Sequence, residues 1–143
     1  MPKLLTVLLL ALATYGTTNI TFPNGKVLKV ELAMTADELG KGLAGRKSIP
    51  ESGVLLVYKA PTRTKYHLMG YPASMDIVYL DENKTIINFI QNAVPCPPGT
   101  ADCGYDSTWL HIYALQLPAG AIKQLNLHGG ESLSFTVPET PPF

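Results

Sequence analysis

Short runs of alternating apolar and polar residues, separated by turn residues, make up most of this chain. Residues 17–22 and 26–32 alternate on either side of Pro23-Asn24-Gly25, and an Asn-Gly dipeptide between two such runs predicts a β-hairpin. Residues 76–80 and 85–90 flank another polar turn and predict a second hairpin. The pattern therefore indicates a chain that is rich in strands.

Three further segments are expected to be strands. Residues 53–58 form an unbroken apolar run, which predicts a strand buried on both faces. Residues 109–117 alternate, and residues 132–137 follow a glycine turn as the last strand. With 12 prolines and 12 glycines to supply turns, about seven short strands predict a mainly β fold, a jelly-roll-like β-sandwich or barrel.

One or two short helices complete the expected fold. Thr35 is followed three residues later by Glu38, a capping-box spacing in which each side chain accepts a hydrogen bond from the other residue's backbone N–H. This spacing predicts a helix over residues 36–43. A second short helix is expected over residues 121–125, directly after Pro118-Ala119-Gly120.

The N-terminus carries one lysine and then an apolar run that ends in Ala11-Leu12-Ala13. This pattern predicts that residues 1–16 are a secretory signal peptide or an N-terminal anchor, since the run is shorter than the roughly 20 residues of a spanning helix. Residues 17–137 are expected to form a single β-rich domain, and the proline-rich residues 138–143 a flexible tail. The expected location is extracytoplasmic, periplasmic or secreted, with membrane contact only through an uncleaved N-terminal segment.

The two cysteines, Cys96 and Cys103, are separated by six residues in a proline-containing loop. Behind a signal-like N-terminus, such a pair predicts a disulfide that closes the loop, since oxidising compartments preserve disulfides. Closing so short a loop removes about 2.5 kcal/mol of chain entropy from the unfolded state. A tetrahedral zinc site would need two more ligands, and a Cys-x-x-Cys redox motif is absent from the sequence.

Charge excludes one class of function. Only 15% of the residues are charged and the formal net charge is zero, without a basic run. Electrostatic binding of nucleic acid is therefore not expected. The sequence also lacks a Gly-x-Ser-x-Gly nucleophile motif and a glycine-rich phosphate loop, and we expect no cofactor.

Several segments occur in an order that resembles the "domain of unknown function 192" family, small and often secreted proteins. The resemblance covers about Ile20 to Phe135 and implies a compact β-sandwich of jelly-roll type without an established activity. Its main segments are Glu31-Leu32-Ala33, Gly42-Leu43-Ala44-Gly45-Arg46, Gly53-Val54-Leu55-Leu56-Val57-Tyr58, Asp76-Ile77-Val78-Tyr79-Leu80-Asp81 and Tyr113-Ala114-Leu115-Gln116-Leu117-Pro118-Ala119-Gly120.

This chain departs from the family pattern at three places, one of which is Ser74-Met75, where the family favours Pro-Leu before its aspartate. Where the family usually shows Phe-Trp-Met followed by Asn-Thr, residues 66–71 read Tyr-His-Leu-Met-Gly-Tyr. Where the family has a glutamate before Leu-Pro-Ala-Gly, this chain has Gln116. A site that the family shares in these stretches would therefore be altered here.

Arg46 and Asp76 correspond to the arginine that ends the family's helix and the aspartate that opens a strand. Each flanks an apolar run, so each is expected to be partly buried and to need a partner. We predict that they form a structural salt bridge between the helix end and the sheet. The alternative makes Arg46 a clamp for a carboxylate or phosphate.

Two histidines could bind a metal. His111 alternates with Trp109 and Tyr113 and is expected on their strand face, while His67 occupies a position where the family has an aromatic residue. If His67 and His111 met near a methionine, imidazole and thioether ligands would suit copper. As an acid or base, Asp76 would need a second ionisable group within reach.

Two classes of function follow from these features. The preferred one is a non-enzymatic extracytoplasmic accessory or binding module with a protein partner, including a subunit of a membrane complex, whose contact surface contains Tyr105, Trp109 and Tyr113 beside the cysteine loop. It predicts an exposed apolar patch and no deep polar pocket. The alternative is a small metal-binding protein or enzyme, whose site brings His67, Asp76 and His111 together.

Overall fold

The computed structural model describes residues 16–66, 68–97, 99–100, 103–106 and 109–139. Fifteen residues of the predicted N-terminal signal or anchor, and the last four of the predicted tail, lie outside this range. Within the range, no helix has the length and apolar character needed to cross a membrane.

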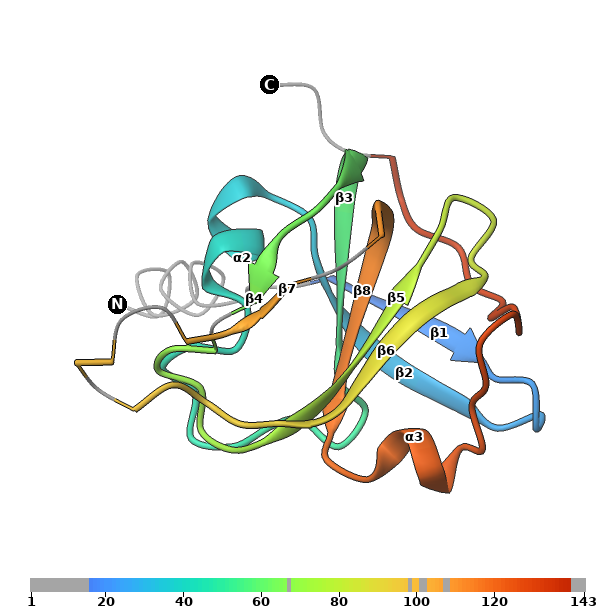
Figure 1. Cartoon of the computed structure of the whole chain (residues 1–143). Coiled ribbons are helices and arrows are strands. Elements are labelled where there is room, and N and C mark those ends of the chain that lie inside the picture. Colours follow the sequence, from blue (N-terminus) through green and yellow to red (C-terminus); the bar gives the residue numbers. More distant parts are fainter. Residues whose placement is uncertain (1–15, 67, 98, 101–102, 107–108, 140–143) are drawn as a thin grey trace, which may run out of the picture.

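The fold is mainly β, as the sequence predicts, with two short helices. Six strands form one mixed sheet that is not closed, in the order β1-β2-β3-β8-β5-β6 (Figure 1). Their bounds are β1 Gly16–Thr21, β2 Val27–Ala33, β3 Val54–Thr62, β8 His111–Pro118, β5 Met75–Leu80 and β6 Ile86–Ala93. All neighbours are antiparallel except β2 and β3. The two predicted hairpins are β1–β2 and β5–β6.

A second, two-stranded sheet lies beside the first. It pairs β4 (Lys65–Tyr66) with β7 (Tyr105–Asp106). The helix α2 (Ala36–Lys41) lies on the same side of the molecule, whereas α3 (Ala121–Gln124) lies at the opposite end of the sheet (Figure 1). These elements divide the surface into an end with α2, β4 and β7 and an end with α3.

The helix α2 begins as the sequence predicts. The Thr35 side chain accepts a hydrogen bond from the Glu38 N–H at 3.1 Å, and the Glu38 carboxylate accepts one from the Thr35 N–H at 3.2 Å. The helix ends two residues earlier than expected, because Gly42 takes a positive φ of 51°. A β-carbon at Gly42 would also overlap the Tyr71 hydroxyl, so both the conformation and the close approach require glycine.

Both faces of the large sheet are covered by apolar side chains. On β3, Leu55 and Val57 enter one hydrophobic cluster, and Val54 and Leu56 enter another on the opposite face. All four side chains are buried, which confirms the prediction from the unbroken apolar run. Ile122 of α3 packs in the first cluster, whereas residues near α2 and β4 pack in the second.

The predicted last strand over residues 132–137 does not form. Among the described residues this segment makes only two isolated bridges, Ser134 with Thr21 and Ser132 with Thr85. Thr21 ends β1, and Thr85 immediately precedes β6, so the segment spans the two edges of the open sheet. Leu133 and Phe135 alternate inward into the first cluster, which explains the strand-like pattern without a strand ladder.

Candidate functional site

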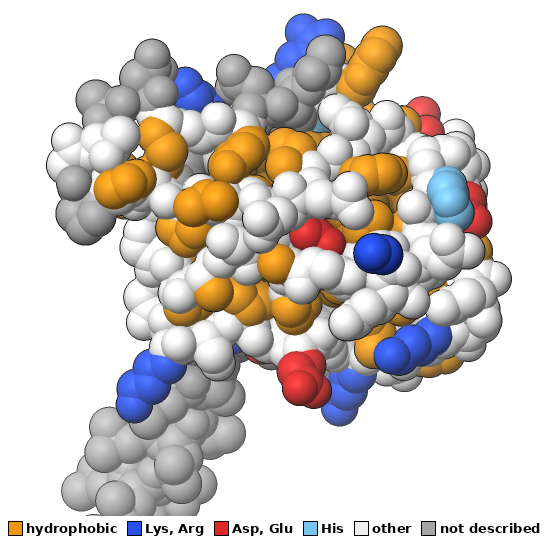
Figure 2. Space-filling model, turned by 60° about the horizontal axis from the view of Figure 1, so that its bottom comes forward, with side chains coloured by type: hydrophobic (Ala, Val, Ile, Leu, Met, Phe, Trp, Pro, Cys, Tyr) orange, Lys and Arg blue, Asp and Glu red, His pale blue; other side chains and the backbone are white. Residues whose placement is uncertain are grey.

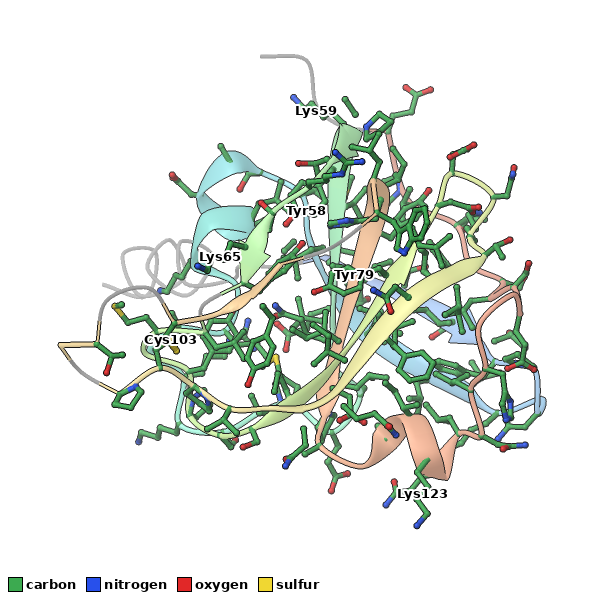
Figure 3. All side chains as sticks on the ribbon, in the orientation of Figure 1. Tyr58, Lys59, Lys65, Tyr79, Cys103 and Lys123 are labelled. Carbon is green, nitrogen blue, oxygen red and sulfur yellow. A yellow bond between two sulfur atoms is a disulfide. The ribbon has the colours of Figure 1, made fainter. Side chains whose placement is uncertain are left out.

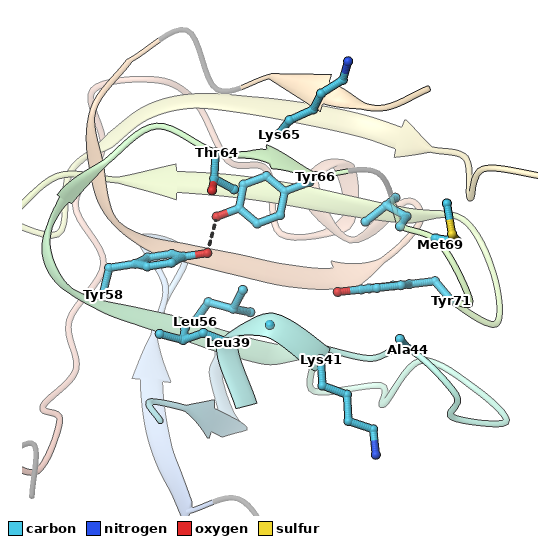
Figure 4. Close-up of a pocket in the computed structure, with 12 residues that line it drawn as sticks. Leu39, Lys41, Ala44, Leu56, Tyr58, Thr64, Lys65, Tyr66, Met69 and Tyr71 are labelled. Atoms are coloured by element: carbon cyan, nitrogen blue, oxygen red, sulfur yellow. Dashed lines mark hydrogen bonds between the residues drawn. The ribbon is translucent and has the colours of Figure 1, made fainter. Parts of the chain in front are cut away.

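A pocket of about 290 Å³ opens between α2, the end of β3, β4 and the segment that follows β4 (Figure 4). We call it the tyrosine pocket, because the hydroxyl groups of three tyrosines point toward its centre. Its lining residues are Leu39, Gly40, Lys41, Ala44, Leu56, Tyr58, Thr64, Lys65, Tyr66, Leu68, Met69 and Tyr71.

Two of the tyrosines begin a chain of hydrogen bonds that runs from the pocket into the protein. The Tyr58 and Tyr66 hydroxyl oxygens lie 2.7 Å apart, and the Tyr66 oxygen lies 3.0 Å from Nε2 of His111. On the other side of the imidazole, Nδ1 lies 3.4 Å from the carbonyl oxygen of Trp109. The His111 ring also packs against the Tyr79 ring at 4.9 Å between centroids. The chain therefore links a half-buried hydroxyl to a fully buried imidazole.

A β-bulge turns His111 toward this chain. The register between β3 and β8 jumps from Val57–Tyr113 to Thr62–His111, so four residues of β3 stand opposite one residue of β8. Pro61 lies inside the bulge, where its missing N–H disturbs no ladder hydrogen bond. His111 packs with the tyrosines, whereas Tyr113 packs in the first cluster. The prediction that the two side chains share a face is wrong because period-two alternation fails across the bulge.

Burial keeps the groups of the chain uncharged at neutral pH. It raises the pKa of Tyr66 far above 10, and the neighbouring Tyr58 adds to the effect. It also raises the pKa of Tyr58, against the smaller, lowering effect of the hydrogen bond between Tyr58 and Tyr66. Burial lowers the pKa of His111 below 6.5, with a smaller opposing effect of the hydrogen bond to the Trp109 carbonyl. The chain is therefore polar but carries no charge.

The third tyrosine comes from the opposite wall. Nε2 of Gln116 donates to the Tyr71 hydroxyl at 3.3 Å. Gln116 is fully buried, and its Oε1 atom has no hydrogen-bond partner among the described residues. Leu39 and Leu56 supply apolar surface to the pocket. The family departures at Tyr71 and Gln116 thus meet in one site.

Two lysines line the pocket, but their amino groups do not enter it. Lys41 and Lys65 point away from the centre in opposite directions (Figure 4). Among the described residues, the lining contains no aspartate or glutamate. The groups that face a ligand are therefore hydroxyl groups and apolar side chains, which favours an uncharged ligand.

Arg46 and Asp76 do not pair with each other, so the predicted salt bridge is wrong in its partners. Arg46 forms a bidentate pair with Glu31, with both N–O distances at 2.8 Å. The fully buried Asp76 carboxylate instead accepts hydrogen bonds from the backbone N–H groups of Asn92, Gly120 and Ile122, at 2.8, 3.1 and 3.0 Å. Asp76 therefore holds α3 and the β6 strand to β5.

The structure also separates Asp76 from His111. Asp76 pairs with Leu117, six positions along β8 from His111, a separation on the order of 20 Å. Asp76 contacts α3, whereas His111 packs on the other sheet face, near Tyr58 and Tyr79 at the end away from α3 (Figure 3). No cluster of three metal-ligating side chains occurs in the described part of the chain, and His67 lies outside it. The predicted convergence around Asp76 does not occur.

The disulfide is present, with 5.9 Å between the Cα atoms of Cys96 and Cys103. A disulfide of this kind points to a non-cytoplasmic environment. Beside the loop, the Tyr105 hydroxyl accepts a hydrogen bond from the Val94 N–H at 2.9 Å, and Tyr105 is half-buried.

Only part of the predicted contact surface is accessible. Trp109 is 59% exposed, and its neighbour Leu110 is 52% exposed. Tyr113 is buried and meets Phe135 edge-to-face at 5.0 Å, so it cannot contribute to a surface. Figure 2 shows a face on which hydrophobic side chains alternate with polar surface and the charged side chains are dispersed.

The sequence alone did not predict the pocket. Its residues come from α2, β3, β4 and residues 68–71, and the side chains behind it come from β8. The available signals were two departures from the family pattern, the stretch 66–71 and Gln116.

A comparison with known protein families identifies the family to which this fold belongs. The family model of the domain of unknown function 192, described as "Uncharacterized ACR", matches residues 19–135. The chain belongs to this family. Among curated proteins, no match to this DUF192 chain is found.

Two crystal structures share the DUF192 fold of this chain. One is a protein from Sinorhizobium meliloti that is described as a proposed transcription regulator, with a TM-score of 0.73 and 23% identity over 86% of this chain and 96% of that one. The other is a protein of unknown function from Novosphingobium aromaticivorans, with a TM-score of 0.71 and 20% identity over 84% of each chain. At such identities the likeness concerns the fold.

Proposed function

We propose that this DUF192 domain is a non-enzymatic extracytoplasmic binding module that takes a small uncharged ligand in the tyrosine pocket. The observation that carries the proposal is the convergence of the Tyr58, Tyr66 and Tyr71 hydroxyls beside an apolar wall. Binding sites for small molecules typically combine mostly apolar walls with a few polar groups that point inward. The volume of about 290 Å³ suits a small ligand.

The state of the polar groups favours binding over catalysis. A general acid or base works best when its pKa lies near the working pH. Burial moves the pKa of Tyr66 upward and that of His111 downward, so both groups hold their uncharged forms at neutral pH. Such groups are suited to fixed hydrogen bonds with a ligand.

The proposed location is the periplasm or the exterior of the cell. The disulfide between Cys96 and Cys103 supports it, together with the signal-like residues 1–16. Retention of that segment would anchor the module at a membrane.

A protein contact is the second proposed role, and the exposed Trp109 and Leu110 favour it. In this role the module is an accessory subunit that contacts its partner through these two side chains. A Trp109→Ser variant should then lose a partner that wild type recovers from native membranes, whereas Val27→Ser, at a similarly exposed site, should retain it. Equal recovery by both variants contradicts the contact.

The pocket is tested directly by NMR with the oxidised protein. A collection of small neutral, acidic and basic compounds is titrated while the methyl signals of Leu39 and Leu56 are followed. Some compounds should shift these signals and leave Ile122, in the first cluster, unchanged.

Matched variants show whether the shifts come from the pocket. Ala44→Leu adds volume to the pocket wall and should abolish them, whereas Ala119→Leu adds the same group to an exposed site near α3 and should not. The proposal fails if no compound shifts the Leu39 and Leu56 methyls, or if Ala44→Leu leaves the shifts as they are.

A further inference from the structure

In the hydrogen-bond chain behind the tyrosine pocket, each group has a fixed role as donor or acceptor. These roles restrict which hydrogen-bonding groups a ligand in the pocket can have. This inference rests on the proposed function and names the class of molecule that the same pocket takes. It follows from counting protons along the chain from Trp109 to Tyr58, because each hydroxyl and each neutral imidazole carries only one proton to donate.

The imidazole sets the direction. Nδ1 of His111 faces the Trp109 carbonyl oxygen, which can only accept, so Nδ1 carries the proton. The described side chains around the ring are Tyr58, Tyr66 and Tyr79, and none of them is an acid that would stabilise an imidazolium. The buried ring is therefore neutral, and its Nε2 atom is a bare acceptor.

Each hydroxyl then has one role. Tyr66 donates its only proton to Nε2 of His111, so its oxygen accepts from the hydroxyl of Tyr58. The Tyr58 hydroxyl therefore donates its single proton to Tyr66, and toward the pocket its oxygen can only accept a hydrogen bond. A ligand atom next to Tyr58 must donate a hydrogen bond.

Tyr71 has the opposite role. Its oxygen accepts from Nε2 of Gln116, so its own proton is not used in that bond. No other hydrogen bond of this hydroxyl occurs among the described residues. The Tyr71 hydroxyl, which points toward the pocket centre, can therefore donate to an acceptor atom of a ligand.

We infer that the ligand is an uncharged, compact ring compound with neighbouring hydroxyl groups, one of which donates to Tyr58 while another oxygen accepts from Tyr71. The apolar face of such a ring would lie on Leu39 and Leu56. Since a water molecule occupies about 30 Å³, the pocket holds about ten water-sized groups, enough for a six-membered ring and its substituents. Cyclic polyols and monosaccharides belong to this class.

Tyr66 is the positioning residue of this scheme. It lies between His111 and Tyr58 and forces the Tyr58 hydroxyl to act as an acceptor toward the ligand. Tyr66→Phe keeps the ring but removes the link, so the Tyr58 proton becomes free to donate into the pocket. The variant should then accept a ligand that has oxygen acceptors but no donor.

The test uses trans-1,2-cyclohexanediol and its dimethyl ether, which keeps both oxygens but has no hydroxyl proton. Wild type should bind the diol at least tenfold more tightly than the ether in NMR titrations at pH 7.5. Tyr58→Phe should weaken diol binding to a similar extent. Tyr66→Phe should bind both compounds with affinities within about threefold, which would also show that the ether fits.

A control variant makes the same chemical change elsewhere. Tyr105→Phe removes a hydroxyl outside the pocket that accepts a hydrogen bond from the Val94 N–H, and this variant should bind the diol like wild type. Independently of any ligand, nitrogen-15 spectra of the His111 ring should show the proton on Nδ1. A proton on Nε2 at neutral pH overturns the direction of the chain.

The remaining outcomes separate this inference from the proposed function. Equal binding of diol and ether by wild type overturns the inferred direction but leaves the pocket as a binding site. Tighter binding of cyclohexanecarboxylate than of the diol overturns the uncharged class. If no diol binds while other compounds shift the Leu39 and Leu56 methyls, the ligand class is wrong and the proposed function stands.

Discussion

Asp76 offers the sharpest test of how this fold is held together. Its two carboxylate oxygens accept three backbone hydrogen bonds in a fully buried site. Oδ1 accepts from Asn92, and Oδ2 accepts from both Gly120 and Ile122. Asp76→Asn keeps the shape of the side chain but replaces one oxygen by an amide that can only donate.

The size of the effect follows from these contacts. The asparagine oxygen can occupy the Oδ2 position and keep two bonds, but its NH₂ group then faces the N–H of Asn92. Hydrogen bonds to a charged acceptor contribute about 2 kcal/mol each, and neutral ones about 1 kcal/mol. The bonds therefore weaken by about 4 kcal/mol in total, and the smaller desolvation cost of a neutral amide offsets about 1 kcal/mol. We expect Asp76→Asn to lower the free energy of unfolding by about 3 kcal/mol.

A matched control is available at Asp81. Its Oδ1 atom accepts from the N–H groups of Asn83 and Thr85 in a partly exposed turn. Because both bonds use the same oxygen, Asp81→Asn can keep both, and it should cost less than about 1 kcal/mol.

Urea unfolding followed by far-ultraviolet circular dichroism, with the disulfide intact and at neutral pH, measures both variants. The slope of the transition should not change. A loss below about 1 kcal/mol for Asp76→Asn, or a loss equal to that of Asp81→Asn, would refute the structural role of the buried carboxylate.

Three other predictions concern separate parts of the domain. Replacing both Cys96 and Cys103 by serine should lower the free energy of unfolding by about 2.5 kcal/mol, because the unfolded loop is no longer closed; an unchanged urea midpoint would contradict this. Gly42→Ala should cost about 2 kcal/mol because of its positive φ and the overlap with a tyrosine hydroxyl, whereas Gly40→Ala, in open space on α2, should add about 0.5–1 kcal/mol. Thermal unfolding of the two alanine variants should therefore shift in opposite directions. Burial lowers the pKa of His111 in the folded protein, so the unfolded state binds more protons than the folded state once the pH falls below about 6.5. The free energy of unfolding should therefore decrease as the pH falls from about 6.5 toward the folded-state pKa of His111. His111→Gln should show a smaller loss of stability than wild type between pH 7.5 and pH 5, and an identical loss would contradict the assignment.

The elements with local signals were predictable from the sequence. The Asn-Gly turn joins two strands, and the Thr35–Glu38 capping box begins α2, because both depend on residues within a few positions of each other. The unbroken apolar run at residues 54–57 marks a strand with two covered faces. The strand predicted over residues 132–137 was wrong. Leu133 and Phe135 alternate inward like strand residues, but the segment only spans the two edges of the sheet.

The candidate site was predictable in part. Asp76 was expected to be partly buried and to need a partner; it is in fact fully buried, and it has hydrogen-bond partners. Its partners could not be named, since they are backbone N–H groups 16 to 46 residues away and carry no sequence signature. The position of His111 was predicted on the wrong face because a bulge in β3 shifts the alternation.

The sequence by itself determined the mainly β class, the two hairpins, the capped helix and the cysteine pair, because alternation, turn residues and capping act over short stretches of chain. Only the tertiary structure decided what those elements bring together. The tyrosine pocket joins α2, β3, β4 and the segment after β4, and its hydroxyl chain reaches β8, across 45 residues of sequence between Tyr66 and His111. The contact between Nδ1 of His111 and the Trp109 carbonyl is local, but only the paired strands bring the Tyr66 hydroxyl to Nε2 of the same ring, so the directed chain exists only in the folded protein.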